Sequence, residues 1–378
     1  MPYFDHAATT KPLDSVITTI SKSMERDYYN PASLYDAAKD VEKKIKNAYI
    51  EIAKTLNCTP DELIQTSGAT ESTNMAFKGL FTKYGHRLNK IIASAADHDA
   101  SLNTLKFLEA KGAEVVLLKP NKDGLLDLDE LKSHLDSKTL LVSILHTNNE
   151  TGVVQDLNAI SKIVREHAEQ AFIHADLVQS WGKVELNLNS LDIDLASFSG
   201  HKIHGPKSTG LLYIRSQTYP EALIHGGGQQ NGWRSGTEDW PLLSGLTEAA
   251  KSIYTNFEEN NTKVSELRDF LVPELKSLGA TINFPNAIPH ILSISFPKYR
   301  GETLLHMLAS EGVYVSTSSA CNAKSAAVSH VLTACNMDRK QAEGTLRISL
   351  DSSNTIEEAE ELLKAMRKVI QQMIDWGM

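Results

Sequence analysis

The sequence has few cysteines and no long hydrophobic run, and both shortages narrow the class of protein. Only three cysteines occur in 378 residues, and no Cys-x-x-Cys pair is among them. An odd, sparse count argues against a disulfide framework and favours a reducing compartment, so we expect a cytoplasmic protein. The longest apolar stretches, such as residues 140–145, are as long as a strand and too short to cross a membrane. The N-terminal residues lack the basic and apolar segments of a signal peptide, so none is expected.

Positive charge is also in short supply. Lys and Arg number 38 against 47 Asp and Glu, which gives a formal net charge of −9 at pH 7. A general nucleic-acid binder carries a basic stripe, so we expect no direct binding of nucleic acid. Hydrophobic residues make up 41% and charged residues 22%, which is ordinary for a globular protein. The length of 378 residues predicts two to three domains.

Short apolar runs alternate with amphipathic segments of helical length between residues 62 and 214. Such runs are typical of strands buried on both faces, and their alternation with helices predicts an α/β fold with a mainly parallel seven-stranded sheet. A ligand is then expected at the carboxyl ends of the strands. The seven expected strands are residues 62–66, 90–93, 114–118, 139–145, 171–174, 195–198 and 210–214.

The pattern changes after the glycine-rich segment 226–232. Two helices are expected at 241–258 and 263–278, strands near 290–296, 312–315 and 345–350, and a final helix at 356–376. This mixture predicts a smaller α+β domain. We therefore expect a large domain from residue 12 to 252 and a small domain made of residues 1–11 and 253–378.

The two commonest nucleotide-binding motifs are missing. The glycine-rich segment has Asn231 where Gly-x-Gly-x-x-Gly needs its third glycine, and Pro206 interrupts the only Walker-like stretch. Residues 66–72 offer a different phosphate site, because a strand ends there among small residues and a helix begins. The simpler alternative is a plain helix cap by Ser67 or Thr70.

Two further strand ends carry chemistry. Asp176 and Gln179 follow an apolar strand. The acid could bind a cationic ring nitrogen of a ligand, and the amide could bind a substituent on the same ring. An equal alternative is that Asp176 is an exposed acid that caps the next helix. Lys202 directly follows the next strand and could form a Schiff base with a carbonyl, although most lysines are simply solvated. His201 and His204 flank it, but without a nearby carboxylate or thiol in the motif no metal site is expected.

One cysteine differs from the others in its surroundings. Cys321 lies in the small, polar segment 316–325, where exposure and a lowered thiol pKa would make it a nucleophile. Cys58 and Cys335 lack this setting, so structural or incidental roles are expected for both. Together these features indicate a site for pyridoxal phosphate (PLP) that works with a cysteine thiol. They are a phosphate seat, an acid, a strand-end lysine and a mobile cysteine.

With these motifs in order, the sequence resembles the NifS/IscS-type cysteine desulfurases, PLP enzymes of the class V aminotransferase superfamily. The resemblance runs from residue 5 to 350 and implies a homodimer of PLP fold type I. His6 stands where the family usually has Asn, Ser318 where Gly is common, and Val328 where Pro usually precedes Ser-His. The most specific stretches are residues 66–72, 148–152, 174–179, 199–206, 234–237 and 319–321.

The resemblance also implies a role for each site residue. Lys202 would bind the cofactor covalently, Asp176 would pair with its ring nitrogen, and His98 would stack on the ring and move protons. Arg347 would receive the substrate carboxylate, helped by Asn149, and Cys321 would attack the substrate sulfur. The other implied cofactor contacts are Gln179 and Asn149 at the phenolic oxygen, and Ala69, Thr70, Ser199, His201 and, from the neighbouring subunit, Thr237 at the phosphate.

The activity implied by the resemblance is conversion of L-cysteine to L-alanine, with sulfur carried as a persulfide on Cys321. The sulfur would pass to an acceptor protein that serves iron–sulfur clusters, tRNA thiolation or cofactor thiolation. Selenocysteine lyase and class V aminotransferase activities are enzymatic alternatives, although an aminotransferase would not need Cys321. A PLP-bearing scaffold that binds partners and turns over weakly is an alternative of another class.

Overall fold

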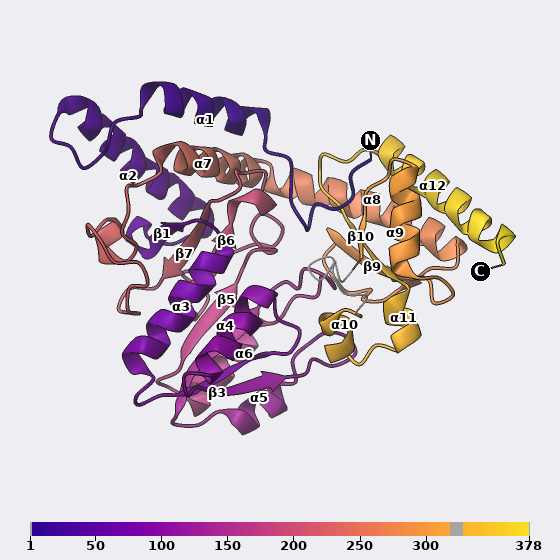
Figure 1. The fold of residues 1–378 in the computed structure, drawn as a ribbon, viewed down its shortest axis with the longest axis horizontal. Coiled ribbons are helices and arrows are strands. Elements are labelled where there is room, and N and C mark those ends of the chain that lie inside the picture. The colour runs from indigo at the N-terminus through magenta and orange to yellow at the C-terminus, as the bar shows by residue number, and fades with distance from the viewer. Residues whose placement is uncertain (1, 318–327, 378) are drawn as a thin grey trace.

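The computed structural model describes residues 2–317 and 328–377 (Figure 1). Its larger sheet has seven strands in the order β1-β7-β6-β5-β4-β2-β3. β7 runs antiparallel to both of its neighbours, and every other adjacent pair is parallel. The predicted fold class is therefore confirmed. The strands are β1 (Leu63–Thr66), β2 (Lys90–Ser94), β3 (Glu114–Leu118), β4 (Thr139–Leu145), β5 (Phe172–Asp176), β6 (Leu195–Ser199) and β7 (Gly210–Ile214).

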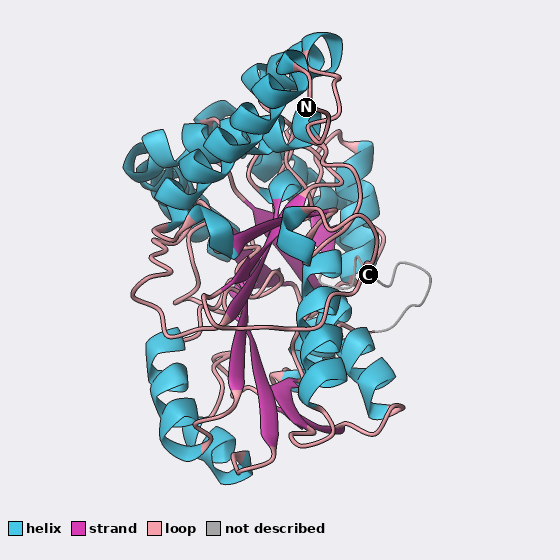
Figure 2. Cartoon of the chain, turned by 90° about the vertical axis from the view of Figure 1, so that its left-hand side faces the viewer, coloured by secondary structure: helices cyan, strands magenta, loops and turns pink. Residues whose placement is uncertain are grey.

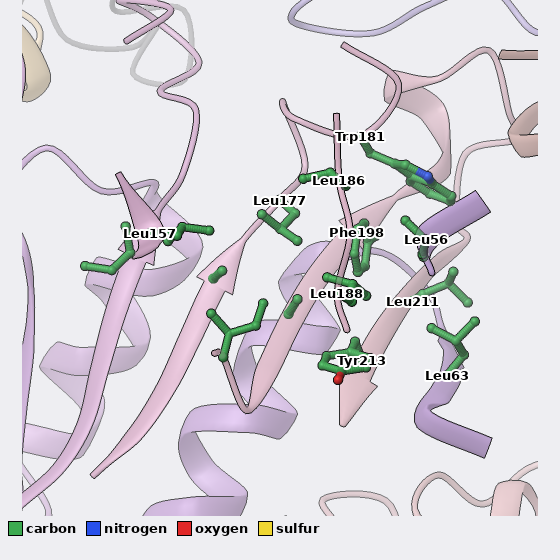
Figure 3. Close-up of a cluster of buried hydrophobic side chains, with 14 of the residues drawn as sticks. Leu56, Leu63, Leu157, Leu177, Trp181, Leu186, Leu188, Phe198, Leu211 and Tyr213 are labelled. Atoms are coloured by element: carbon green, nitrogen blue, oxygen red, sulfur yellow. The ribbon is translucent and has the colours of Figure 1, made fainter. Parts of the chain in front are cut away.

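Helices cover both faces of this sheet, which is why nearly all residues of its central strands are buried (Figure 2). Residues from α3 (Ala69–Tyr84) and α4 (Asp99–Glu109) pack on one face, and residues from α2 (Asp36–Leu56) pack on the other. On that second face, the rings of Trp181 and Phe198 meet edge to face at 5.2 Å (Figure 3). Three more helices pack on the same face, namely α5 (Leu128–His134), α6 (Leu157–His167) and α7 (Trp240–Thr255), and α1 (Asp14–Arg26) lies along α7.

A second sheet of four strands, in the order β10-β11-β9-β8, builds the other part of the molecule (Figure 1). Its adjacent strands are all antiparallel, and an apolar core of its own lies between the strands and three helices. The strands are β8 (Thr281–Ile282), β9 (Ile291–Ser295), β10 (Ser316–Thr317) and β11 (Thr345–Ser349). The helices are α8 (Phe257–Ser277), α9 (Gly301–Ser310) and α12 (Ile356–Asp375), with the short α10 (His330–Ala334) and α11 (Arg339–Glu343) nearby.

The structure corrects one expected strand in this part. Residues 312–315 form no regular strand: Tyr314 makes a single bridge with Tyr3, and β10 begins only at Ser316. The physical reason is that this segment pairs with the distant N-terminus, which periodicity along the chain cannot reveal. The predicted division into domains stays a prediction, and its boundary after residue 252 falls within α7 (Trp240–Thr255).

An N-terminal segment, residues 2–10, joins the two sheets. The Phe4 amide donates to the Tyr314 carbonyl at 2.8 Å, and the Phe4 carbonyl accepts from the Ser349 amide at 2.8 Å. Further along, the Thr10 amide donates to the carbonyl of His201, next to Lys202, at 2.9 Å. In the described part of the chain, no helix has both the length and the apolar character that a membrane span requires.

Candidate active site

Six of the seven strands of the large sheet run in one direction and end at the same edge, and the predicted site residues follow five of these ends. β1, β2, β4, β5 and β6 all point the same way, because the two antiparallel pairings of β7 restore the direction of β1. The turn after each strand brings polar residues to this edge. The strand ends lead to Ser67 and Gly68, Asp97 and His98, Asn148 and Asn149, Asp176, and Ser199 to Lys202.

Asp176 ends β5 and is 4% exposed. Its Oδ1 accepts a hydrogen bond from the Val178 amide at 3.0 Å. Burial raises its pKa, while the charges of His98 and Lys202 act in the opposite direction. An acid in this position would be held ionised by a cationic partner such as a protonated ring nitrogen.

His98 begins α4 as its N-cap, and its Nδ1 accepts from the Ala100 amide at 3.1 Å. In a neutral ring the proton must then be on Nε2, so the capping bond selects the tautomer. The adjoining Asp97 is completely buried, and burial together with the Asp176 charge raises its pKa to about 8. With a pKa of about 8, Asp97 is mostly protonated at neutral pH.

Lys202 ends a short 3-10 turn, Gly200–Lys202, directly after β6. Its Nζ donates to the carbonyl oxygens of Ala7 and Ala8, both at 2.7 Å. The same Ala7 carbonyl accepts from Nε2 of Gln179 at 2.9 Å. Lys202 and Gln179 therefore meet at the N-terminal segment, as residues that contact one ligand should.

The expected phosphate seat is assembled from α3 and the end of β6. Gly68, the N-cap of α3, has φ of 141°, and a Cβ built on it would lie 3.8 Å from Ser199 Oγ. Ala69 and Thr70 form the first turn of α3, where backbone N–H groups lack partners within the helix. His201 lies after Ser199, with Nδ1 3.0 Å from Thr9 Oγ1.

Burial and neighbouring groups determine the charge of His201 at this seat. The pKa of His201 is lowered to about 4 by burial and by the charge of Lys202, so the ring is neutral at pH 7. Thr237, the remaining residue of the predicted set, lies on an exposed loop before α7. Arg234 ties that loop to α3, with Nε 3.0 Å from Glu71 Oε1.

Arg347 reaches the same region from β11 of the smaller sheet and is 4% exposed. Its Nη1 donates to the carbonyl of Asn149 at 2.8 Å, and its Nη2 to Asp5 Oδ1 at 2.7 Å. The buried Nε makes no hydrogen bond within the described part of the chain. A guanidinium fixed by two hydrogen bonds, with further N–H groups able to donate, is suited to binding a carboxylate.

Cys321 lies outside the described residues. The two described cysteines are protonated at neutral pH, because burial raises the pKa of Cys58 to about 12 and that of Cys335 to about 11. Neither thiol suits a nucleophile, in keeping with the structural or incidental roles expected for them. Among residues 2–317 and 328–377, no group of His, Cys, Asp and Glu side chains could hold a metal ion.

Several site residues escaped sequence reasoning. Asp97, Lys183 and Asp5 carry no local sequence signal beyond their charge. Glu150 lies in the Asn-Asn-Glu motif; its Oε2 accepts from Ser329 Oγ at 2.6 Å, and burial raises its pKa to about 7. Only tertiary contacts between distant segments show that these residues lie at the site.

The chemistry of these residues fits PLP. A buried acid for the ring nitrogen, an amine beside it and the N-terminus of α3 for the phosphate lie along one edge. Gly68 has a φ of 141°, a conformation that favours glycine, and without a side chain it leaves the backbone at this seat accessible. The predicted cofactor residues are therefore brought together, apart from Thr237 on its exposed loop.

Comparisons with known proteins agree with this arrangement. The family Aminotransferase class-V matches residues 2–362. Cysteine desulfurase IscS of Dictyoglomus turgidum is 36% identical over 98% of this chain and 95% of its own length. A solved NifS-like protein superimposes with a TM-score of 0.93 at 37% identity, covering 98% of this chain and 99% of that one. The structure of SspA in complex with cysteine has a TM-score of 0.84 at 32% identity, over 94% of this chain and 100% of that one.

These similarities extend over nearly the whole chain and include the strand-end edge described above. The chain therefore belongs to the class V aminotransferase family, with IscS cysteine desulfurases and NifS-like proteins among its relatives, and is a PLP-dependent enzyme.

Proposed function

We propose that this chain converts L-cysteine to L-alanine and carries the sulfur as a persulfide on Cys321 before passing it to an acceptor protein. The observation that supports this best is that Arg347 projects from the smaller sheet and contacts Asn149, next to the edge that holds Lys202 and Asp176. A substrate carboxylate can thus be held apart from the cofactor residues. The similarity to IscS and to SspA with bound cysteine favours cysteine as that substrate.

Each residue has a distinct part in this proposal. Arg347, with Asn149, binds the carboxylate of cysteine and orients its α-carbon. His98 and Lys202 take up and return protons beside that carbon; a positioned acid–base group contributes about 10² to 10⁴ in rate. Asp176 pairs with the ring nitrogen. PLP, when bound, supplies an electron sink that makes the α-proton acidic.

Sulfur transfer needs no external oxidant or reductant. The Cys321 thiolate attacks the substrate sulfur, forming an S–S bond while the C–S bond breaks. The electron pair of the C–S bond stays with the substrate carbon, which takes a proton and leaves as alanine. Because Cys58 and Cys335 are protonated near neutral pH, Cys321 is the thiol left for this step.

The test follows alanine and protein-bound sulfur after addition of L-cysteine to the holoenzyme. Wild type should form alanine and bind one labelled sulfur per active site. Cys321→Ser should keep the visible absorption of PLP and lose the bound sulfur, whereas Cys335→Ala, a matched control, should still carry it. Lys202→Ala should lose the borohydride-reducible bond to the cofactor.

Three outcomes would contradict the proposal. Turnover of Cys321→Ser at the wild-type rate would exclude the persulfide route. Formation of alanine and selenide from selenocysteine, with none from cysteine, would identify a selenocysteine lyase. Absence of any turnover by a PLP-loaded wild type would favour a scaffold.

We also propose a cytoplasmic homodimer in which Thr237 serves the partner's cofactor site. Large apolar side chains on the α1–α2 edge support an interface there, since Leu34 is 87% and Met24 is 64% exposed. Leu34→Glu should shift sedimentation from the mass of two chains to that of one. An unchanged dimer in that variant would place the interface elsewhere.

A further inference from the structure

Lys183 is a polar residue beside the active site that the proposed mechanism does not use. Its Nζ donates to Gln179 Oε1 at 2.8 Å. Nε2 of the same amide donates to the carbonyl of Ala7 at 2.9 Å, and that carbonyl also accepts from Lys202 Nζ at 2.7 Å. A continuous chain of hydrogen bonds therefore runs from Lys183 through Gln179 to the atoms around Lys202.

This chain determines which way the Gln179 amide points. When Lys183 is protonated, its ammonium group has only donors, so the end of the amide that faces it must be the carbonyl oxygen. The Ala7 carbonyl has only acceptor capacity, so it requires the NH₂ end. Gln179 is 2% exposed, which leaves little water to compensate a flipped amide.

We propose that Lys183 is a positioning residue that keeps the NH₂ group of Gln179 turned towards Ala7 and the bound cofactor. The proposal rests on the proposed function and on the contact, implied by the family resemblance, between Gln179 and the phenolic oxygen of PLP. One N–H of the amide serves Ala7, and the second is then available to that oxygen. A donor there stabilises the ionised oxygen, whereas a flipped amide would present a carbonyl and repel it.

The surroundings of Lys183 suit this role. Lys183 and Lys202 both line a cavity of about 380 Å³ between the N-terminal segment and α7–α8. Burial and the charge of Lys202 lower the Lys183 pKa to about 7, and Asp351 opposes them. The charged or titratable groups acting on Lys183 or sensing its charge are Lys202, Arg347, Asp351, His6, His201, His204 and His290.

The experiment uses holoenzyme and follows the visible absorption band of PLP as a function of pH. Lys183→Met keeps the length of the side chain and removes its donors. We expect the midpoint of the band to move to higher pH by about one unit, because the ionised phenolic oxygen loses its donor. PLP should also dissociate roughly tenfold more readily. Lys183→Arg, for which the cavity leaves room, should restore both properties.

A double-mutant cycle separates positioning from the loss of a charge. Gln179→Leu should reproduce the shifted midpoint, and Lys183→Met should add nothing in the Gln179→Leu background. Lys11→Met removes a cation from the rim of the same cavity without touching the amide, and it should leave the midpoint in place.

Two results would overturn the proposal. One is an unchanged midpoint in Lys183→Met; the other is a shift of the same size with and without Gln179, which would assign the effect to charge alone. Failure of the proposed function is distinguishable, because it would appear as wild type that binds PLP and forms no alanine.

Discussion

At the scale of single residues, Arg347 combines two anchors with an unused donor. Asp5 and the Asn149 carbonyl hold its two terminal nitrogens, while Nε has no hydrogen-bond partner in the described part of the chain. The family resemblance implies Arg347 as the carboxylate-binding residue, and its contacts explain why an arginine is required. A lysine at this position would have a single nitrogen, which cannot take the place of two separate terminal nitrogens bonded to Asp5 and to the Asn149 carbonyl.

Arg347→Lys is therefore expected to bind cysteine poorly while keeping the cofactor. We expect KM for L-cysteine to rise roughly tenfold to a hundredfold, with the PLP spectrum unchanged. Steady-state kinetics and absorbance measure the two effects. Arg339→Lys is the control, because Arg339 is an exposed residue paired with Glu343. A normal KM in Arg347→Lys would remove Arg347 from the substrate site.

At the scale of elements, the phosphate seat depends on how closely β7 approaches the turn before α3. A Cβ built on Gly210 would lie 2.4 Å from the Phe198 carbonyl oxygen and 2.7 Å from Gly68 Cα. Both neighbours are backbone atoms, so neither can rotate away. The strands themselves were predictable, because buried parallel strands appear in a sequence as short apolar runs. The close approach of Gly210 to Gly68 was not predictable, because it joins residues far apart in sequence.

Gly210→Ala should therefore disturb both stability and cofactor binding. Forcing the two segments apart is expected to lower the free energy of unfolding by about 1–3 kcal/mol and to weaken PLP binding. Gly112→Ala is the control for cofactor binding: its φ of 99° disfavours alanine and costs stability by itself, but no heavy atom lies within 4 Å of the added Cβ. Chemical denaturation and PLP titration give both quantities, and equal weakening of PLP binding in the two variants would contradict the steric explanation.

At the scale of the whole molecule, His204 and Asp351 connect the two sheets. His204 Nε2 lies 2.9 Å from Asp351 Oδ2, and Nδ1 lies 2.9 Å from the Lys11 carbonyl. Both ring nitrogens thus face acceptors, which only the doubly protonated ring can satisfy. Asp351 raises the pKa of His204 in spite of burial, and the pKa of Asp351 is lowered in return.

The pair makes stability depend on pH in a definite direction. Because the folded pKa of His204 is raised, its contribution is complete below about pH 6.5, the ordinary histidine value, and is lost as pH rises through the folded pKa. The contribution of Asp351 is present above about pH 4 and is lost in stronger acid. The pair is therefore most stabilising between these limits.

Asp351→Asn should remove this dependence. We expect a loss of about 1.5–3 kcal/mol near pH 6 and a smaller loss near pH 8, measured by denaturation at each pH. Asn keeps an oxygen for the Ser353 amide, which donates to Asp351 Oδ1 at 3.0 Å. Asp14→Asn, an exposed acid on the same cavity, is the control. An equal loss at both pH values would exclude a protonated His204.

The sequence alone was enough to identify the α/β class, the strand-end positions of Asp176 and Lys202, and the cofactor that suits them. These features are local, because hydrophobic periodicity and the residue that follows a strand can be seen in a short stretch of sequence. Only the tertiary structure decided that Lys183 donates to Gln179, that Asp5 contacts Arg347, and that Tyr314 pairs with the N-terminus. Each of these contacts joins groups whose meeting depends on the packing of other elements.

The cysteine count illustrates the same division. Three thiols are too few for a disulfide framework, and composition shows that directly. Which thiols are unreactive is a matter of burial, which raises the pKa of Cys58 and Cys335 far above neutral pH. Burial is a property of the folded chain, because the atoms that exclude water from each sulfur come from many separate segments.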